Sequence, residues 1–301
     1  MVRPARFTMN AQTAVDNFYQ DAEASFNADE VQKLALAEFD AFVEKLRAVG
    51  VHVDVLQDTP EPHTPDSIFP NNWISLHESG TVCLYPMKAE NRRLERKPDI
   101  ADTLSSWGFR IDAVNDITAS EERGVYLEGT GAIIFDHPSK TAFMARSQRA
   151  DEALFRAWCE DMDYTPVVFS SFQDTPEGRQ PIYHTNVMMC VADSFVVICL
   201  DTIDNANERK AVVDKLTELD KEIIEITEAQ KHQFAGNMLQ VGAAAGPVLV
   251  MSQSAYKSLT TEQISAIESH CPILYADLAW IERLGGGSAR CMIAENYLPT
   301  K

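Results

Sequence analysis

The chain has 301 residues, 45% of them hydrophobic, and carries a formal net charge of −19 at pH 7. A chain of this length can bury a substantial core as one large domain or two small ones. Its negative charge argues against nucleic acid as a partner, because phosphates would be repelled. No stretch approaches the roughly 18 consecutive apolar residues of a membrane span, and no apolar signal core follows the N-terminus. We therefore expect a cytoplasmic protein without a membrane partner, and leave a homo-oligomer open.

The cysteines and histidines do not have the spacing of a metal site. The six cysteines are scattered and form no CxxC pair, and the seven histidines form no HxxxH pair. In the cytoplasm these cysteines should be reduced. We expect neither a structural nor a catalytic zinc site.

The N-terminal third contains one clear amphipathic helix. Apolar residues between Val31 and Val49 recur at spacings of three and four, which gives one apolar face. Asn27 and Glu30 fit a capping box at its start, and Gly50 supplies the stop. The alternating residues 51–56 that follow predict a strand.

From residue 69 onward one pattern recurs, in which a polar or glycine-containing motif leads into a strand, a tight turn, a second strand and a helix. The motifs begin at 69, 127, 184 and 236, and a fifth motif strand is expected at 288–293. The predicted turns lie at 77–80, 136–140, 192–194 and 243–246. The predicted helices lie at 98–107, 149–162, 205–219 and 260–270.

One polar landmark can be taken from each motif: Asn71, Glu128, His184, Asn237 and Cys291. Successive landmarks are 57, 56, 53 and 54 residues apart. Even spacing is typical of repeat architectures, and five units close most simply into a ring. In a ring the five motifs would converge on the central axis. The alternative is that strands and helices alternate at this spacing by coincidence.

Three of these landmarks have the chemistry of one reaction centre. Cys291 follows a glycine-rich run and Arg290, which suits a thiolate nucleophile, although a small buried cysteine is the alternative. The imidazole of His184 suits proton transfer near neutral pH. Glu128 lies among apolar and glycine neighbours, where an unpaired carboxylate is costly. His184 or Glu128 alone would be interpreted as an ordinary polar residue. Together with Cys291 they supply a nucleophile, a base and an orienting carboxylate.

The motifs that carry these residues resemble those of the arginine deiminase–amidinotransferase superfamily. The match consists of Leu127-Glu128-Gly129-Thr130-Gly131, His184-Thr185-Asn186 and Gly287-Ser288-Ala289-Arg290-Cys291, in that order over nearly the whole chain. The resemblance implies an α/β fold, a five-bladed ββαβ propeller (pentein) with pseudo-fivefold symmetry, formed by residues 1–301 as a single domain. It also implies that Cys291 attacks a guanidine or ureido carbon, His184 acts as general acid and base, and Glu128 binds substrate nitrogen.

The same resemblance implies how the other end of an amino-acid substrate is held. Arg92 or Arg93, and Arg149, look like the arginines that bind the substrate α-carboxylate. A guanidinium group suits bidentate recognition of a carboxylate. The alternative for each arginine is a surface position that serves solubility.

The sequence departs from the deiminases around the reacting group. Neutral side chains, Asn71, Asn72 and Asn186, stand where extra carboxylates would surround a guanidinium, although Asp66 remains. Burying a cation with so few carboxylates costs more than burying a neutral urea. The pocket is therefore better matched to citrulline than to arginine. By its motifs at 69–73 and 184–189 the chain also resembles the citrulline-hydrolase branch of the superfamily (citrulline ureidase, CtlX-like).

We therefore expect a hydrolase that converts citrulline to ornithine, CO2 and ammonia through a thioester on Cys291, without cofactor or metal. Two alternatives stay open within the class, an arginine deiminase and an amidinotransferase. A third, from another class, is a non-catalytic propeller that binds proteins. That alternative predicts a missing triad, and all three positions are filled here.

Overall fold

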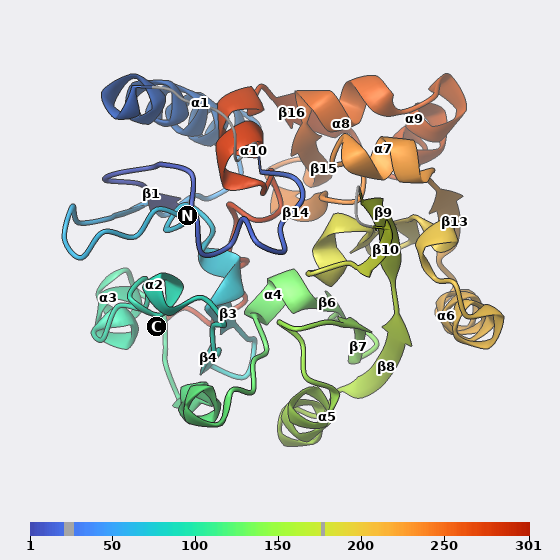
Figure 1. Ribbon diagram of the computed structural model, residues 1–301, viewed down its shortest axis with the longest axis horizontal. Helices are drawn as coiled ribbons and strands as arrows, with labels where there is room; N and C mark the ends of the chain where they lie inside the picture. Colours follow the sequence, from blue (N-terminus) through green and yellow to red (C-terminus); the bar gives the residue numbers. More distant parts are fainter. Residues whose placement is uncertain (21–26, 176–177) are drawn as a thin grey trace.

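The computed structural model describes residues 1–20, 27–175 and 178–301, and its α/β fold repeats one unit (Figure 1). In each unit an antiparallel strand pair is followed by a helix and a third strand, which pairs in parallel with the second. The described residues contain four complete units. Their strands and helices, in chain order, are as follows: β3 Ile74–Leu76, β4 Thr81–Leu84, α3 Ile100–Ser106 and β5 Ala113–Asp116; β6 Ile133–Asp136, β7 Thr141–Arg146, α5 Glu152–Asp161 and β8 Thr165–Ser170; β11 Met189–Val191, β12 Phe195–Ile198, α6 Ala206–Glu218 and β13 Glu222–Glu225; β14 Leu239–Ala243, β15 Gly246–Ser252, α9 Thr261–Glu268 and β16 Ile273–Ala276.

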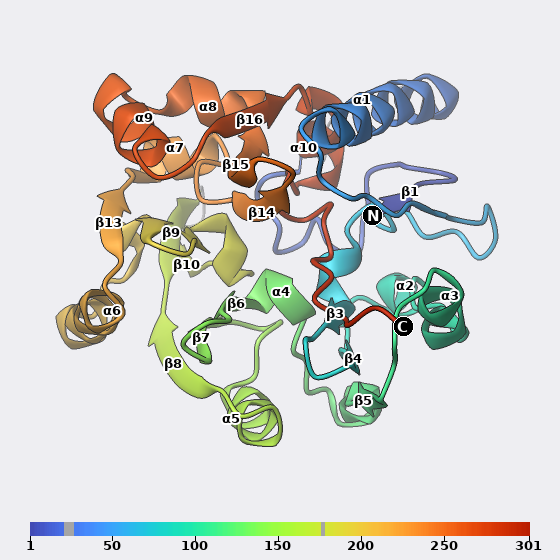
Figure 2. The same cartoon turned by 180° about the vertical axis from the view of Figure 1, so that it is seen from behind.

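The N-terminal part of the chain differs from these four units. Here α1 (Ala28–Ala48) connects two short parallel strands, β1 (Val2–Arg3) and β2 (Leu56–Gln57). Figures 1 and 2 show α1, α3, α5, α6 and α9 at the periphery of the molecule. The four predicted helices and four predicted turns of the repeat are confirmed, with helix ends that differ by up to three residues.

The predicted helix of the N-terminal third is α1, and its ends follow the expected signals. The Asn27 side chain accepts hydrogen bonds from the backbone N–H groups of Asp29 and Glu30. Gly50 adopts a positive φ of 85°, which allows the chain to turn out of the helix. The buried face of α1 packs with β16, α10 (Ala279–Gly285) and the segment around Cys291.

Two predicted strands are wrong. Residues 51–55 are not in a strand. The strand begins only at Leu56, because β1 has two residues and pairs with Leu56 and Gln57. Residues 288–293 form consecutive turns instead of a strand. There, the N–H groups of Cys291, Met292 and Ile293 donate to the carbonyls three residues earlier, which curls the backbone.

Several short elements connect the units. An unpredicted hairpin, β9 with β10, lies between the second and third units. The short elements that surround the repeats are η1 Pro70–Asn72, α2 Glu90–Arg93, η2 Thr118–Arg123, α4 Gly129–Ala132, β9 Phe172–Thr175, β10 Gly178–Pro181, η3 Thr185–Val187, η4 Leu200–Thr202, α7 Glu228–His232 and α8 Gln253–Ser258.

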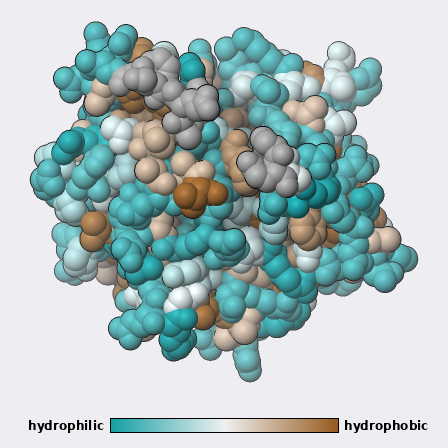
Figure 3. Space-filling view, viewed as in Figure 1, coloured by the Kyte–Doolittle hydropathy of each residue, from teal (hydrophilic) through white to brown (hydrophobic). Residues whose placement is uncertain are grey.

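The face of the molecule seen in Figure 3 is mainly polar, and apolar side chains appear on it in small separate areas. No helix in the described parts of the chain has both the length and the apolar character needed to cross a membrane.

Candidate active site

The five sequence motifs form turns that contact one another in cyclic order. The Thr130 hydroxyl donates to the Asn71 carbonyl at 3.2 Å, and the Thr185 hydroxyl donates to the Ala132 carbonyl at 2.5 Å. The Asn237 amide then bridges the third and fifth turns, donating to the Asn186 carbonyl at 3.0 Å and to the Cys291 sulfur at 3.3 Å.

The cycle closes between the fifth turn and the first. A Cβ atom at Gly285 or Gly287 would lie 2.7 or 2.9 Å from the Phe69 ring. Only glycine allows the backbone to pass this close to the aromatic ring. The polar landmarks of all five motifs are thereby brought to one region.

Glu128 and His184 form a buried pair. His184 Nε2 lies 2.7 Å from Glu128 Oε2, and both side chains are almost completely buried. The other Glu128 oxygen accepts from the Lys88 backbone N–H at 2.9 Å. Burial alone would raise the Glu128 pKa, but Arg149 and the His184 hydrogen bond outweigh it and lower the pKa to about 2.

His184 is neutral at pH 7 in this surrounding. Burial lowers its pKa from the ordinary value, and the Glu128 carboxylate opposes this only in part. A Cβ at Gly131 would lie 2.8 Å from His184 Cε1 and 2.3 Å from Asn72 Nδ2. Glycine at position 131 therefore leaves free the space that the imidazole and the Asn72 amide occupy.

Cys291 is buried, and side-chain amides from two other turns donate hydrogen bonds to its sulfur. Its sulfur lies 3.4 Å from Asn186 Nδ2 and 3.3 Å from Asn237 Nδ2. Amide N–H groups can donate hydrogen bonds to a sulfur anion. Residues 184–186 thus connect the Glu128–His184 pair to the cysteine.

Arg290 does not have the position expected from the sequence. Its guanidinium lies 3.0 Å from Glu295 and donates to the Ile293 carbonyl at 3.1 Å. The groups in contact with the Cys291 sulfur are therefore the neutral amides of Asn186 and Asn237.

Arg92 lies beside the first motif turn and is surrounded by acceptors. Its guanidinium bonds Glu95 at 2.8 Å and Asn72 Oδ1 at 2.6 Å, and lies 3.7 Å from Asp66. Burial raises the Asp66 pKa, and it raises the Glu95 pKa to about 7. A substrate carboxylate would reach Arg92 only if one of these contacts opened.

Arg93 is likewise engaged, because it donates to the carbonyls of Met87 and Lys88 at 2.9 and 3.2 Å. Both arginines therefore hold the backbone around the site in this structure. Binding of a carboxylate by either one stays a prediction.

Several buried polar atoms near the motif turns have no hydrogen-bond partner among the described residues. They are both side-chain atoms of Asn71, Asn72 Nδ2, Asn186 Oδ1 and Asp66 Oδ1. Buried polar groups are nearly always hydrogen-bonded in folded proteins. These amide atoms and the Asp66 oxygen are thus available to a polar ligand.

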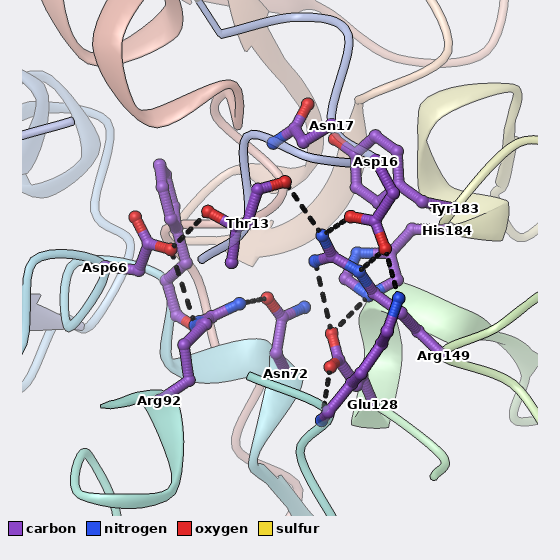
Figure 4. Close-up of polar contacts among 12 residues, drawn as sticks. Thr13, Asp16, Asn17, Asp66, Asn72, Arg92, Glu128, Arg149, Tyr183 and His184 are labelled. Carbon is purple, nitrogen blue, oxygen red and sulfur yellow. Dashed lines mark hydrogen bonds and ion pairs between the residues drawn. The ribbon is translucent and has the colours of Figure 1, made fainter. Parts of the chain in front are cut away.

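The N-terminal segment covers this region and was not predicted to take part. Asn10 and Thr13 donate to Asp66 at 2.7 and 3.2 Å, and Gln20 donates to the Gly285 carbonyl at 3.0 Å. Asp16 pairs with Arg149 (Figure 4). It also pairs with Lys88. These residues of the N-terminal segment follow no regular spacing in the sequence that could have singled them out. Asn237, by contrast, was already one of the five landmarks.

Among the described residues, no group of three or more histidine, cysteine, aspartate or glutamate side chains is arranged to hold a metal ion.

Comparison with solved structures identifies the fold. The apo structure of ArgZ, an arginine dihydrolase of cyanobacteria, matches 97% of this chain and 39% of its own, with a TM-score of 0.74 and 14% identity. Its N-terminal domain, covalently bound to a reaction intermediate, matches over 99% of this chain and 98% of its own (TM-score 0.74, 15% identity). A dimethylarginine dimethylaminohydrolase adduct with S-methyl-L-thiocitrulline matches over 97% and 96% (TM-score 0.64, 15% identity). The chain thus spans about two fifths of full-length ArgZ.

The fold and the family comparison place the chain in the arginine deiminase–amidinotransferase superfamily. Residues 3–298 match the family model described as N,N dimethylarginine dimethylhydrolase, eukaryotic, and the chain belongs to this family. Comparison with curated proteins found no match.

Proposed function

We propose that the chain hydrolyses the ureido group of citrulline, giving ornithine, CO2 and ammonia, with Cys291 as nucleophile. The observation that carries this proposal is the set of unpartnered amide atoms on Asn71, Asn72 and Asn186, in the region of Cys291 and the Glu128–His184 pair. Neutral amides offer both donors and acceptors, which suits an uncharged urea. A guanidinium would instead need carboxylates to offset its desolvation.

In this mechanism the Cys291 thiolate attacks the ureido carbon, and the bond to the terminal nitrogen breaks. His184 first takes the proton of the Cys291 thiol and then delivers it to the terminal nitrogen, so that ammonia leaves. Glu128 orients His184 and accepts a hydrogen bond from substrate nitrogen. The product is an alkylcarbamoyl thioester on Cys291. Water activated by His184 then attacks the thioester, which frees the thiol and a carbamate, and the carbamate loses CO2 to give ornithine.

The second candidate is a guanidino substrate, either arginine or an N-methylated arginine. Two buried carboxylates, Glu128 and Asp66, favour it, since together they can offset one cation. The family description and the arginine-acting relatives agree with this candidate. It shares the nucleophile and the proton-transfer residues with the first.

We further propose that residues 1–301 form one domain, a five-bladed propeller. Four repeated units and the cyclic contacts of the five motif turns support this, with the fifth blade formed by β1, α1, β2 and the segment that carries Cys291. A cytoplasmic location and a homo-oligomer stay predictions.

A substrate panel tests the proposal. L-citrulline, L-arginine and dimethylarginine are assayed under identical conditions for ammonia, CO2 and ornithine. We expect kcat/KM to favour L-citrulline by roughly 10⁴ or more, because a hydrogen-bonding mismatch in a buried site discriminates strongly. A ratio in favour of either guanidino compound rejects the ureido substrate. Asn186→Asp should lower turnover of L-citrulline, because it places a second charge beside the Cys291 sulfur.

A further inference from the structure

Glu282, a buried carboxyl group in α10, lies next to the turn that carries Cys291. The Ser288 hydroxyl donates a hydrogen bond to Glu282 Oε1 at 2.6 Å, and both side chains are almost completely buried. The Ser288 carbonyl in turn accepts from the Cys291 N–H at 3.0 Å. Ser288 therefore connects Glu282 to the backbone of the proposed nucleophile.

The second Glu282 oxygen is held by the fourth repeated unit. Ser254, in the first turn of α8, donates to Glu282 Oε2 at 2.5 Å. The Ser254 hydroxyl also lies 2.8 Å from the hydroxyl of Ser252, which caps α8. Burial raises the Glu282 pKa, and the serine hydroxyls around it oppose this rise. Each carboxyl oxygen thus has its own partner, so α8 and α10 together fix where the group lies.

The chain between Glu282 and Ser288 provides little conformational restraint of its own. It contains three consecutive glycines at 285–287, and glycine restricts the backbone least of all residues. The Gly286 N–H donates to the Glu282 carbonyl at 2.9 Å, and the Tyr183 hydroxyl donates to the Gly286 carbonyl at 2.9 Å. These contacts act on the glycine run. The hydrogen bond between Ser288 and Glu282 acts on the turn itself.

The Cys291 sulfur depends on the position of this turn, because its partners lie on two other turns. It is 3.4 Å from Asn186 Nδ2 and 3.3 Å from Asn237 Nδ2. A displacement of about 1 Å away from these amides would break both hydrogen bonds. A misplacement of that size in a reacting group can lower a rate by about 100-fold.

We propose that Glu282 is a positioning residue, which holds the Ser288 hydroxyl and thereby keeps the Cys291 sulfur beside the two amides. The inference rests on the proposed function for the role of Cys291 as nucleophile. Glu282 touches no reacting atom and acts through Ser288. Loss of their hydrogen bond should therefore lower kcat and leave KM nearly unchanged, since the groups proposed to bind the substrate belong to other turns.

Steady-state kinetics of Ser288→Ala, Glu282→Ala and the double variant test this role, with whichever of L-citrulline, L-arginine and dimethylarginine the wild type hydrolyses. We expect each single variant to lower kcat by roughly 10- to 100-fold, with a change in KM of less than about threefold. The double variant should be no slower than the slower single variant, because both residues act through one hydrogen bond. Additive losses, or losses that fall on KM, overturn the inference.

Glu282→Gln is the conservative variant. Its amide oxygen can still accept from the Ser288 hydroxyl, so we expect it to keep kcat within about threefold of the wild type. A kcat as low as that of Glu282→Ala would mean that the charge of Glu282 matters and not its bond to Ser288, which contradicts the inference.

The matched control is Glu38→Ala, because Glu38 holds the other end of α10. Its carboxylate accepts from the N–H groups of Trp280 and Ile281 at 2.9 and 3.0 Å. If Glu282 served only to stabilise α10, the two residues would share that role. Glu38→Ala should lower the unfolding free energy but change kcat by less than about twofold. Equal losses of kcat in Glu38→Ala and Glu282→Ala reject a positioning role.

The rate at which iodoacetamide alkylates Cys291 separates this inference from the proposed function, because it needs no substrate. If the wild type hydrolyses none of the three compounds, the proposed function fails, and this rate decides the role of Glu282. The thiolate is the reactive form and loses its amide hydrogen bonds when the turn moves. We expect labelling of the Cys291 peptide to be roughly tenfold slower in Ser288→Ala and Glu282→Ala and unchanged in Glu38→Ala. An unchanged or faster rate in Ser288→Ala overturns the inference.

Discussion

At the residue scale, the central feature is a buried carboxylate that stays ionised. Glu128 has no exposed surface, yet it accepts hydrogen bonds from His184 and Lys88 and lies close to Arg149. These contacts offset the cost of burying the charge. An ionised Glu128 in turn fixes the orientation of the His184 ring through their hydrogen bond.

Glu128→Gln should remove a pH-dependent part of the stability. The folded-state pKa is about 2 and the ordinary value is 4.5, so the ionised carboxylate stabilises the fold fully above pH 4.5. This contribution is on the order of 3 kcal/mol and is lost as the pH falls toward 2. Urea denaturation of both proteins between pH 7 and pH 2.5 measures it. A difference in unfolding free energy that does not shrink with falling pH contradicts the assignment.

The sequence was sufficient to place Glu128, His184 and Cys291 together, because their spacing follows the repeat and their chemistry is complementary. It was not sufficient for Asp16 or Lys88. Neither is a repeat landmark, and their side chains meet only after the N-terminal segment has packed onto the first unit. The hydrogen-bond partners of Arg92 and Arg290 could not be predicted from the sequence either, because the buried surroundings decide which acceptor each guanidinium binds.

At the scale of elements, α1 supports the segment that carries Cys291. Its buried face shares one hydrophobic cluster with α10, Ala289, Cys291 and Met292. The periodic apolar residues were enough to predict this helix. The strand predicted at 288–293 failed because apolar alternation does not reveal a run of turns held by hydrogen bonds three residues apart.

Phe42→Ala in α1 should destabilise the fold by about 3–5 kcal/mol, because it leaves a cavity in that cluster. Val49→Ala, at the exposed end of the same helix, is the control and should change the unfolding free energy by less than about 0.5 kcal/mol. Chemical denaturation measures both. Similar losses for the two variants would mean that α1 does not pack as described.

At the scale of the whole molecule, the repeat places five distant motifs side by side. Each turn contacts the next through a hydrogen bond or a close approach at glycine, so the site depends on all five. The even spacing of the five motifs in the sequence predicted that they would converge. The pairing of β1 with β2 was not predicted, because two-residue strands have no periodicity to detect.

Gly236→Ala tests the contact between the third and fourth turns. A Cβ at this position would lie 2.3 Å from the Val187 carbonyl oxygen, which the backbone can relieve only by moving. We expect a loss of about 1–3 kcal/mol in unfolding free energy. Gly242→Ala, where a Cβ meets no atom within 4 Å, should be close to neutral. Equal effects of the two substitutions would argue against the close packing of the turns.

The most direct measurement is the mass of the cysteine-containing peptides after rapid acid quenching of the enzyme during turnover of L-citrulline. The proposed mechanism predicts an alkylcarbamoyl adduct on Cys291, absent from the other five cysteines, and no adduct or turnover in Cys291→Ser. Turnover that persists in Cys291→Ser, or an adduct on another cysteine, contradicts the central claim that Cys291 attacks the ureido carbon.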